Sequence, residues 1–547
     1  MDPKENDRFN TILINGYEEL LREKPANPEA HYIYHLLKNI APEIRKSDST
    51  LNAFFEAYHE ELKNQKPDPE SLFANKSQFY NENSEFDYDY FVIGAGEPAI
   101  TSAIIASKFG KRVAIAEYVL PSTQGSTWDF GGTSLNSSCV PKKLMYISKL
   151  SSQSREAETV EWEVEGKLNS WNTAIGSINK YVRELRVSDK LILAENSVKF
   201  YNTTVRFIDS HSLELYDPKK SRFEKVTAKY IVLALEARPT IPEDIQGAKE
   251  FGITTDDLFL LRDNPSNLLI VGGSFIALEL AGFLRSIGVN VTIITRGSIL
   301  KQVDQDIVAK IVKDLESRGV KILTNTVVQS IQQTPEGKKK VNYKSVQNGS
   351  EEFDTVLFAT GRQINPSDIA VEAAGINIDP TTKLINTNER DETNVSHIYA
   401  IGDLVSNKPR FLHTTLQAAL LLPKRLFGNS SDLMDYIHSP KVMFTPLEYS
   451  SVGLTEDAAV AQYGRDQIVV CNGVFNPSQG GISKARKDEN CFIKAITKKN
   501  ENGKVVGLHV TGPHALDVVN LFVTDIANGA TWKTLLKVVG IRPIQEE

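Results

Sequence analysis

The apolar residues near the start of the chain recur at the spacing of amphipathic helices. From Phe9 to Leu21 they fall on one face of a helix, and a second stripe continues to Ile40, with Pro28 suited to the first turn of that second helix. The pattern therefore predicts a helical hairpin within residues 1–45. Because so short a hairpin buries little apolar surface, we expect it to dimerise or to dock onto another surface.

A further apolar stripe, from Leu51 to Leu62, predicts another helix. The residues after it are rich in Pro, Asn and Ser, which is typical of a connecting segment. Residues 46–87 are therefore interpreted as a helix and linker.

Two later parts of the chain repeat the order strand, glycine-rich turn, helix. The first begins with the apolar run 90–93 and continues into Gly94, Gly96 and Ala99, and the next strand, 113–116, is followed by Glu117. Gly94 permits a tight turn, Gly96 lets a diphosphate approach the N-terminus of the helix, and an acid in the place of Glu117 binds a ribose hydroxyl. This order predicts a dinucleotide-binding unit.

The second unit starts at the expected strand 267–271. Its turn contains Gly272 and Ser274, its helix carries Ala277, and the following strand leads to Arg296 and Lys301 in place of an acid. Cations at that point suit the 2′-phosphate of NADPH, so NADPH is expected rather than NADH. The alternative, that both are solvated surface charges, stays open.

Composition narrows the possible classes of protein. The chain has 547 residues, of which 41% are hydrophobic, enough for several domains with cores of their own. A net charge of −7 gives no overall basic face for nucleic acid, and no apolar run has the length needed to cross a bilayer. We therefore expect no nucleic-acid partner, no membrane partner and a cytoplasmic location.

The three cysteines are Cys139, Cys471 and Cys491. Their odd number and wide spacing indicate a reducing compartment and predict neither a disulfide framework nor a metal site. Cys471 and Cys491 are interpreted as small buried hydrophobic residues.

The segment 131–143, GGTSLNSSCVPKK, resembles the redox-active helix of the flavin-dependent pyridine nucleotide-disulfide reductases, and within them the large thioredoxin reductases. Ser134 stands where that family has its first cysteine, and Cys139 matches the second. The resemblance implies that Gly132 and Thr133 contact FAD and that Cys139 lies against the flavin. A serine hydroxyl has no disulfide chemistry, so Ser134 is expected to abolish dithiol exchange.

Other family positions are retained. The resemblance implies that Asp403 holds the ribityl chain of FAD, that Gly361 marks a crossing between domains, and that Glu279 pairs with Lys142 beside the flavin. Phe275 stands where thioredoxin reductases often place a tyrosine over the flavin. The other crossing departs from the pattern, because Glu236 replaces a glycine there and is expected to disturb FAD binding.

The last part of the chain resembles the dimer-interface domain of the same family, in its segments 442–449 and 505–513. This implies a homodimer formed through that domain. Glu547 matches the acid of the family's catalytic His-Pro-x-x-x-Glu motif, but Arg542 replaces the histidine base and is unable to shuttle protons. The mobile cysteine- or selenocysteine-bearing tail is also expected to be absent.

The expected fold class is therefore α/β, with two Rossmann-like dinucleotide-binding domains, an α+β dimer-interface domain and a small helical hairpin in front. The predicted domain ranges are 1–45 for the hairpin, 46–87 for the helix and linker, 88–235 with 355–430 for the FAD-binding domain, 236–354 for the NADPH-binding domain, and 431–547 for the interface domain.

The hairpin sequence resembles the dimerisation-docking motif of the Dpy-thirty type, which is related to the module of protein kinase A regulatory subunits. That resemblance implies that residues 8–40 bind an amphipathic helix of an anchoring protein. Such modules occur in ciliary axonemes, notably radial spokes, and in chromatin complexes. The alternative is a helical cap without a docking role.

Three functional hypotheses follow. The leading one is a degenerate thioredoxin-reductase-like flavoprotein, a pseudoenzyme that serves as a structural or regulatory component of an assembly such as the ciliary axoneme. The second is an active NADPH-dependent FAD oxidoreductase of the diaphorase or oxidase type. The third is a thioredoxin-disulfide reductase whose missing thiols come from a partner.

Overall fold

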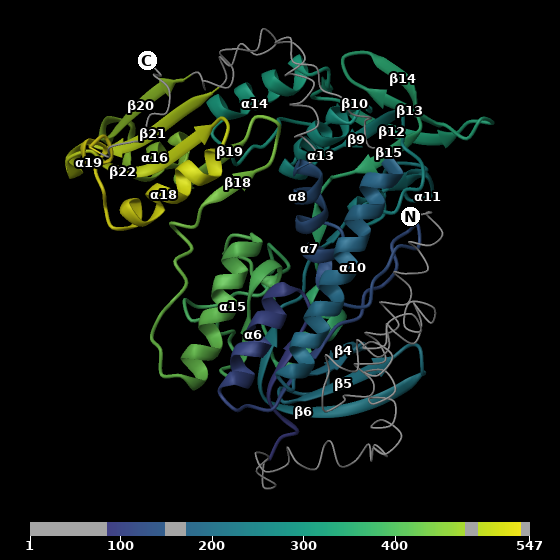
Figure 1. Ribbon diagram of the computed structural model, residues 1–547, viewed down its shortest axis with the longest axis vertical. Helices are drawn as coiled ribbons and strands as arrows, with labels where there is room; N and C mark the ends of the chain where they lie inside the picture. The colour runs from purple at the N-terminus through teal and green to yellow at the C-terminus, as the bar shows by residue number, and fades with distance from the viewer. Residues whose placement is uncertain (1–84, 148–170, 476–490, 538–547) are drawn as a thin grey trace, which may run out of the picture. The chain divides into compact units, whose positions relative to one another are not determined.

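The computed structural model describes residues 85–147, 171–475 and 491–537 (Figure 1). Among the described residues, 86–147, 171–186, 197–475 and 491–537 belong to one compact unit, and residues 85 and 187–196 belong to another. The first holds every element below except the end of α10 (Trp171–Glu195). The predicted hairpin, the helix and linker up to residue 84, Arg542 and Glu547 lie outside the described residues.

A seven-stranded sheet organises the N-terminal part of the larger unit. Its order is β3-β2-β1-β6-β5-β4, and β17 also pairs with β6. The strands are β1 (Tyr88–Ile93), β2 (Val113–Ala116), β3 (Lys199–Tyr201), β4 (Thr204–Phe207), β5 (Ser212–Asp217), β6 (Arg222–Leu233) and β17 (Ile398–Ala400). Helices α6 (Glu97–Lys108) and α15 (Leu412–Phe427) lie side by side in this part. The end of β1 is fully buried, as expected for a parallel strand covered on both faces.

The second sheet is parallel throughout and has the order β11-β10-β9-β15-β8. Its strands are β8 (Gly252–Ile253), β9 (Asn267–Val271), β10 (Asn290–Ile294), β11 (Lys321–Leu323) and β15 (Thr355–Phe358), and a three-stranded sheet of β12 (Val327–Gln333), β13 (Lys339–Lys344) and β14 (Asn348–Phe353) accompanies it. The predicted NADPH range ended at residue 354, but β15 pairs with β9. Residues 355–358 therefore lie in this sheet, and the second crossing follows them at Ala359-Thr360-Gly361, where the sequence placed it.

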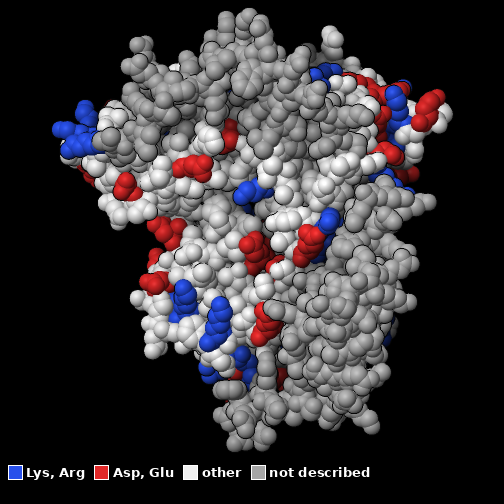
Figure 2. All heavy atoms as spheres, in the orientation of Figure 1, with Lys and Arg blue, Asp and Glu red and all other residues white. Residues whose placement is uncertain are grey.

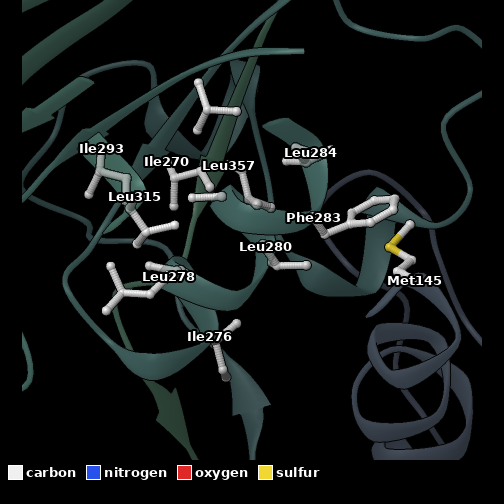
Figure 3. Packing of buried hydrophobic residues seen from close by; sticks show 14 of the residues in the cluster. Met145, Ile270, Ile276, Leu278, Leu280, Phe283, Leu284, Ile293, Leu315 and Leu357 are labelled. Atoms are coloured by element: carbon white, nitrogen blue, oxygen red, sulfur yellow. The ribbon is translucent and has the colours of Figure 1, made fainter. Parts of the chain in front are cut away.

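The core of this part lies beneath α13 (Phe275–Ser286), and α14 (Gln305–Ser317) contributes to it. Leu280 and Leu284 pack with residues of the sheet such as Ile270, and Met145 from α8 (Cys139–Ile147) lies beside Phe283 (Figure 3). The shared core fixes α8 against α13, so the segment that carries Cys139 is positioned by the second dinucleotide unit.

A third, antiparallel sheet has the order β18-β19-β22-β21-β20. Its strands are β18 (Lys441–Met443), β19 (Tyr449–Gly453), β20 (Ile468–Val474), β21 (Phe492–Lys498) and β22 (Lys504–Thr511), with helices α16 (Glu456–Tyr463), α18 (Ala515–Ala527) and α19 (Trp532–Leu535). The predicted fold class is confirmed: the chain is α/β, with two dinucleotide-binding domains and an interface domain.

On the face shown in Figure 2, the basic and acidic side chains of the described residues are interspersed. Among the helices that the structure describes, none combines the length and the apolar character needed to cross a bilayer. All three cysteines lie in described segments, and no disulfide joins them.

Candidate dinucleotide and redox site

The two predicted glycine turns share one geometry. Gly94 has a φ of +125°, and a Cβ atom there would lie 2.4 Å from the carbonyl oxygen of Ala234. Gly272 has a φ of +136°, and its Cβ would lie 2.4 Å from the carbonyl oxygen of Ala359. Each turn thus requires glycine because it touches the backbone of one crossing segment. The crossings are joined further on, where β7 (Arg238–Pro239) pairs with β16 (Arg362–Gln363).

The first turn lies beside the glycine pair Gly131-Gly132. Gly96 is the N-cap of α6, and an isolated bridge joins it to Gly131, the N-cap of α7 (Gly132–Asn136). We call the surface made by Gly96, Gly132 and the backbone N–H groups of Thr133 and Ser134 the diphosphate cradle. Backbone donors and missing side chains make such a surface suited to an anion.

The side chain of Glu236 fills this cradle. Its Oε2 accepts hydrogen bonds from the backbone N–H of Thr133 and, at 3.0 Å, from that of Ser134. A Cβ atom on Gly96 would lie 2.7 Å from Oε1, and one on Gly132 would lie 2.7 Å from Oε2. The backbone of Glu236 does not have a positive φ, so a glutamate is accommodated there without backbone strain. The sequence identified Glu236 as a departure from the family pattern, but it did not predict that the carboxylate would lie in the cradle.

Three carboxylates gather around the cradle. Buried Glu117 accepts a hydrogen bond from Gly132 N at 3.2 Å, and Asp403 accepts one from Ala237 N at 2.8 Å. Burial, together with the charge of Glu236, raises the pKa of Glu117 to about 7. Burial also raises the pKa of Glu236, with a further contribution from Asp403. The cradle therefore already carries more negative charge than is favourable before any ligand enters.

The predicted redox-active helix consists of two helices. The first, α7, ends at Asn136, and α8 (Cys139–Ile147) begins three residues later. Between them, Ser137 leaves the helical conformation with a φ of −141°, and its hydroxyl donates to Asp256 Oδ1 at 2.6 Å. The single helix expected from the resemblance is thus wrong, and the break follows from this contact with a residue 119 positions away.

Cys139 is half-buried at the start of α8. Burial raises the pKa of its thiol, although Lys142 and a hydrogen bond with Ser134 act in the opposite direction. Thiolate formation is therefore disfavoured at neutral pH. No second cysteine accompanies it in the segment, because residue 134 is a serine.

The ion pair expected from the resemblance is present, since Lys142 Nζ lies 2.8 Å from Glu279 Oε2. Glu279 Oε1 also accepts a hydrogen bond from Phe444 N at 2.8 Å, which fixes the carboxylate between two elements. The ammonium group lies 5.2 Å from the centre of the Phe275 ring. The role of this pair beside a flavin remains a prediction.

The second turn has the features needed for a nucleotide. Ser274 caps α13 by accepting a hydrogen bond from Ala277 N, and Leu300 N donates to Gly273 O at 3.1 Å. That bond brings the loop with Arg296 and Lys301 beside the turn, and both cations are exposed. Their predicted contact with a 2′-phosphate stays a prediction, and this position is compatible with it.

A cavity of about 930 Å³ connects the predicted residues. Its lining includes Ser134, Cys139, Lys142, Glu236, Phe275, Gly361 and Asp403. It brings the predicted redox residues and several of the predicted FAD contacts together, whereas Arg296 and Lys301 lie elsewhere.

The sequence missed Arg238, whose Nη2 donates to Asp256 Oδ2 at 2.8 Å and whose guanidinium lies 4.7 Å from the Trp128 ring centre. This cation also acts on Glu117, where it opposes the rise in pKa. Only its position two residues after Glu236 could have suggested a role near the cradle.

Comparison with known proteins agrees with this arrangement. Residues 88–419 match the pyridine nucleotide-disulphide oxidoreductase model, and residues 439–547 match the dimerisation domain of the same group. The chain is 38% identical to thioredoxin reductase SEP1 of Emiliania huxleyi, over 85% of this chain and 95% of the relative. It is 33% identical to mitochondrial thioredoxin reductase 2 of Drosophila melanogaster, over 84% of this chain and 90% of the relative.

These matches imply FAD and NADPH as cofactors. The second turn has the geometry that a nucleotide needs, and Gly272 and Ser274 are the residues that would hold its diphosphate. The first unit has the cavity for FAD, but the carboxylate of Glu236 lies where a diphosphate would contact Gly96 and Gly132, so FAD fits only when that side chain leaves the cradle. Because the two models match almost everything after residue 87, the chain belongs to the pyridine nucleotide-disulphide oxidoreductase family, with thioredoxin reductases among its relatives.

Proposed function

We propose that this chain is a thioredoxin-reductase-like protein that has lost dithiol exchange and serves as a structural or regulatory component of a larger assembly. Ser134 is the observation that carries the proposal. Its hydroxyl donates to Glu236 Oε1 at 3.0 Å, so the position that needs a thiol is held by a residue in a stable polar contact. An alcohol forms no disulfide with Cys139 or with a substrate.

Arg542 supports the same proposal from the sequence. By resemblance to the family, Arg542 stands where the family has the histidine that activates the exchange thiol. A guanidinium group stays protonated at every physiological pH and does not act as a general base. Ser134 and Arg542 therefore both remove a group that disulfide reduction needs.

The nucleotide-binding parts are better preserved. Gly272, Ser274 and the ion pair of Lys142 with Glu279 keep the arrangement expected for the family. A protein that retains this scaffold while losing its exchange thiol is suited to a role in which folding, dimerisation or nucleotide binding matters more than turnover.

The dimerisation domain supports a homodimer. In such a dimer two N-terminal hairpins are present at high effective concentration and can pair into one groove. We propose that residues 8–40 of both copies bind an amphipathic helix of an anchoring protein, in the ciliary axoneme and most specifically in a radial spoke. The support is the resemblance of these residues to dimerisation-docking motifs and the apolar stripe that needs a partner.

A second candidate, an NADPH-dependent FAD oxidoreductase with an acceptor other than a disulfide, is favoured by one observation. Lys142 and Glu279 form a largely buried ion pair beside Cys139 and Phe275, and a purely structural protein has no evident need for it. Buried charges are costly unless they serve packing or chemistry.

The test uses the purified full-length chain with NADPH and oxidised thioredoxin, with a thioredoxin reductase as positive control. We expect no thioredoxin reduction above background. Steady reduction by the chain alone would overturn the proposal. In a parallel assay with oxygen or a quinone, NADPH consumption that depends on added FAD would instead favour the second candidate.

A further inference from the structure

The contacts of Glu236 resemble those of a bound anion rather than those of a surface side chain. Its two oxygens accept from the backbone N–H groups of Thr133 and Ser134 and from the Ser134 hydroxyl. The carboxylate takes the space that a side chain on Gly96 or Gly132 would need, and these are the two residues whose missing side chains open the cradle. These are the donors and the space that a diphosphate needs.

A diphosphate and this carboxylate cannot share the cradle. The space above Gly96 and Gly132 is taken, because an added Cβ atom at either residue would lie only 2.7 Å from a Glu236 oxygen. The charges also repel, since Glu117 and Asp403 already face the same region. A ligand with two further negative charges must therefore displace Glu236 and break its three hydrogen bonds.

The second unit shows the same architecture without this obstacle. The segment Ala359-Thr360-Gly361 passes Gly272 as the segment Ala234-Leu235-Glu236 passes Gly94. The third position is Gly361 there, and a Cβ atom on it would meet nothing closer than 4.0 Å. The obstruction is therefore specific to the first unit.

We infer that Glu236 is an internal anion that competes with the diphosphate of FAD for the cradle, so that the protein binds FAD weakly and reversibly. The inference rests on family membership and on the geometry of the cradle. It does not depend on the proposed loss of dithiol exchange, and either can fail without the other.

The test measures FAD binding by the full-length chain through quenching of flavin fluorescence. Glu236→Gly removes the competitor and restores the residue type found at Gly361, and Glu236→Gln keeps the shape while removing the charge. Glu97→Gln is the matched control, because Glu97 is an exposed acid that lines the same cavity. NADPH affinity, measured in parallel, reports whether each variant keeps the second unit intact.

We expect Glu236→Gly to bind FAD at least about tenfold more tightly than the unmodified chain, since even one close like charge is worth that factor. Glu236→Gln should give a smaller gain, and Glu97→Gln less than either. Equal affinities in the unmodified chain and Glu236→Gly would overturn the inference. An equal gain from Glu97→Gln would also overturn it, because the effect would then be one of general charge and not of occupancy.

Discussion

The hydroxyl of Ser134 donates a hydrogen bond of 3.0 Å to the carboxylate of Glu236, although the two residues are 102 positions apart in the chain. Ser134 replaces the first cysteine of the family pattern, and Glu236 replaces a crossing glycine. The two departures therefore contact each other and satisfy each other's polar groups. Changing Ser134 alone would leave the Glu236 carboxylate in the cradle. Changing Glu236 alone would leave a serine where the family has its first cysteine.

Ser134→Cys alone is predicted not to restore thioredoxin reduction. The new thiol would face the carboxylate of Glu236, whose negative charge disfavours a thiolate. Arg542 would still be unable to act as the general base. The measurement is NADPH-dependent thioredoxin reduction by the purified variant, with added FAD. The double variant Ser134→Cys with Glu236→Gly tests how far the carboxylate alone is responsible. Substantial turnover from the single substitution would show that neither Glu236 nor Arg542 prevents dithiol exchange.

Glu117 is predicted to make the FAD-free protein less stable as the pH rises. Its pKa is about 7 in the folded chain and near 4.5 as the ordinary value, so the folded state binds the proton more tightly. The resulting stabilisation is fully present below about pH 4.5 and is lost as the pH rises through 7. The groups that act on Glu117 are Glu236, which raises its pKa, and Arg238, which lowers it.

The measurement compares thermal unfolding of the unmodified chain and Glu117→Gln between pH 5 and 8. Because glutamine does not titrate, the melting temperature of the unmodified chain should fall relative to that of the variant as the pH increases. A constant difference between the two proteins across this range would show that Glu117 titrates at its ordinary pKa.

Lys494→Met is predicted to destabilise the fold strongly. Lys494 is 2% exposed, and its Nζ lies within 3.0 Å of Asp304, Asp306 and Glu456. Removing the cation leaves buried Asp304 beside two other carboxylates, at a cost of about 3 to 5 kcal/mol. Urea unfolding of the full-length chain measures this.

The matched control is Lys321→Met. Lys321 pairs with Glu351 at 2.7 Å, but its side chain is 50% exposed. Exposed pairs contribute at most about 1 kcal/mol, so this variant should unfold close to the unmodified chain. Equal effects of the two substitutions would mean that the Lys494 cluster carries no special stability.

Leu20→Asp or Leu37→Asp is predicted to release the protein from its anchoring assembly. Either change places a charge in the apolar stripe of the predicted hairpin, whose burial is the basis of the proposed docking. Co-sedimentation with isolated axonemes measures the release, and NADPH binding reports that the body remains folded. If both variants stay with the axoneme, the hairpin is not the anchor.

Much of the fold follows from local pattern. The strands β2 and β9 begin and end where the apolar runs 113–116 and 267–271 predict, and α6 and α13 follow their glycine turns. Such units are predictable because a parallel strand, a tight turn and a helix N-terminus each impose a requirement on adjacent residues. Even the pairing of Lys142 with Glu279 could be expected from resemblance.

The parts that could not be predicted depend on contacts between distant segments. The break between α7 and α8 follows from the bond of Ser137 to Asp256, and the extra strand β15 is recognised only by its pairing with β9. The glutamate at position 236 was evident in the sequence, but whether its side chain faces solvent or the cradle depends on three-dimensional proximity to Gly96 and Gly132.

Gly94 contacts Ala234 in the same way as Gly272 contacts Ala359. The second nucleotide unit can therefore serve as a reference for the first within one molecule. One polypeptide holds a substituted crossing, with Glu236, and an unsubstituted one, with Gly361, in the same sample and at the same concentration. The ratio of its affinities for the two nucleotides is therefore independent of errors in protein concentration or active fraction. Following that ratio through the Glu236 variants separates a change at one crossing from a change in the whole fold.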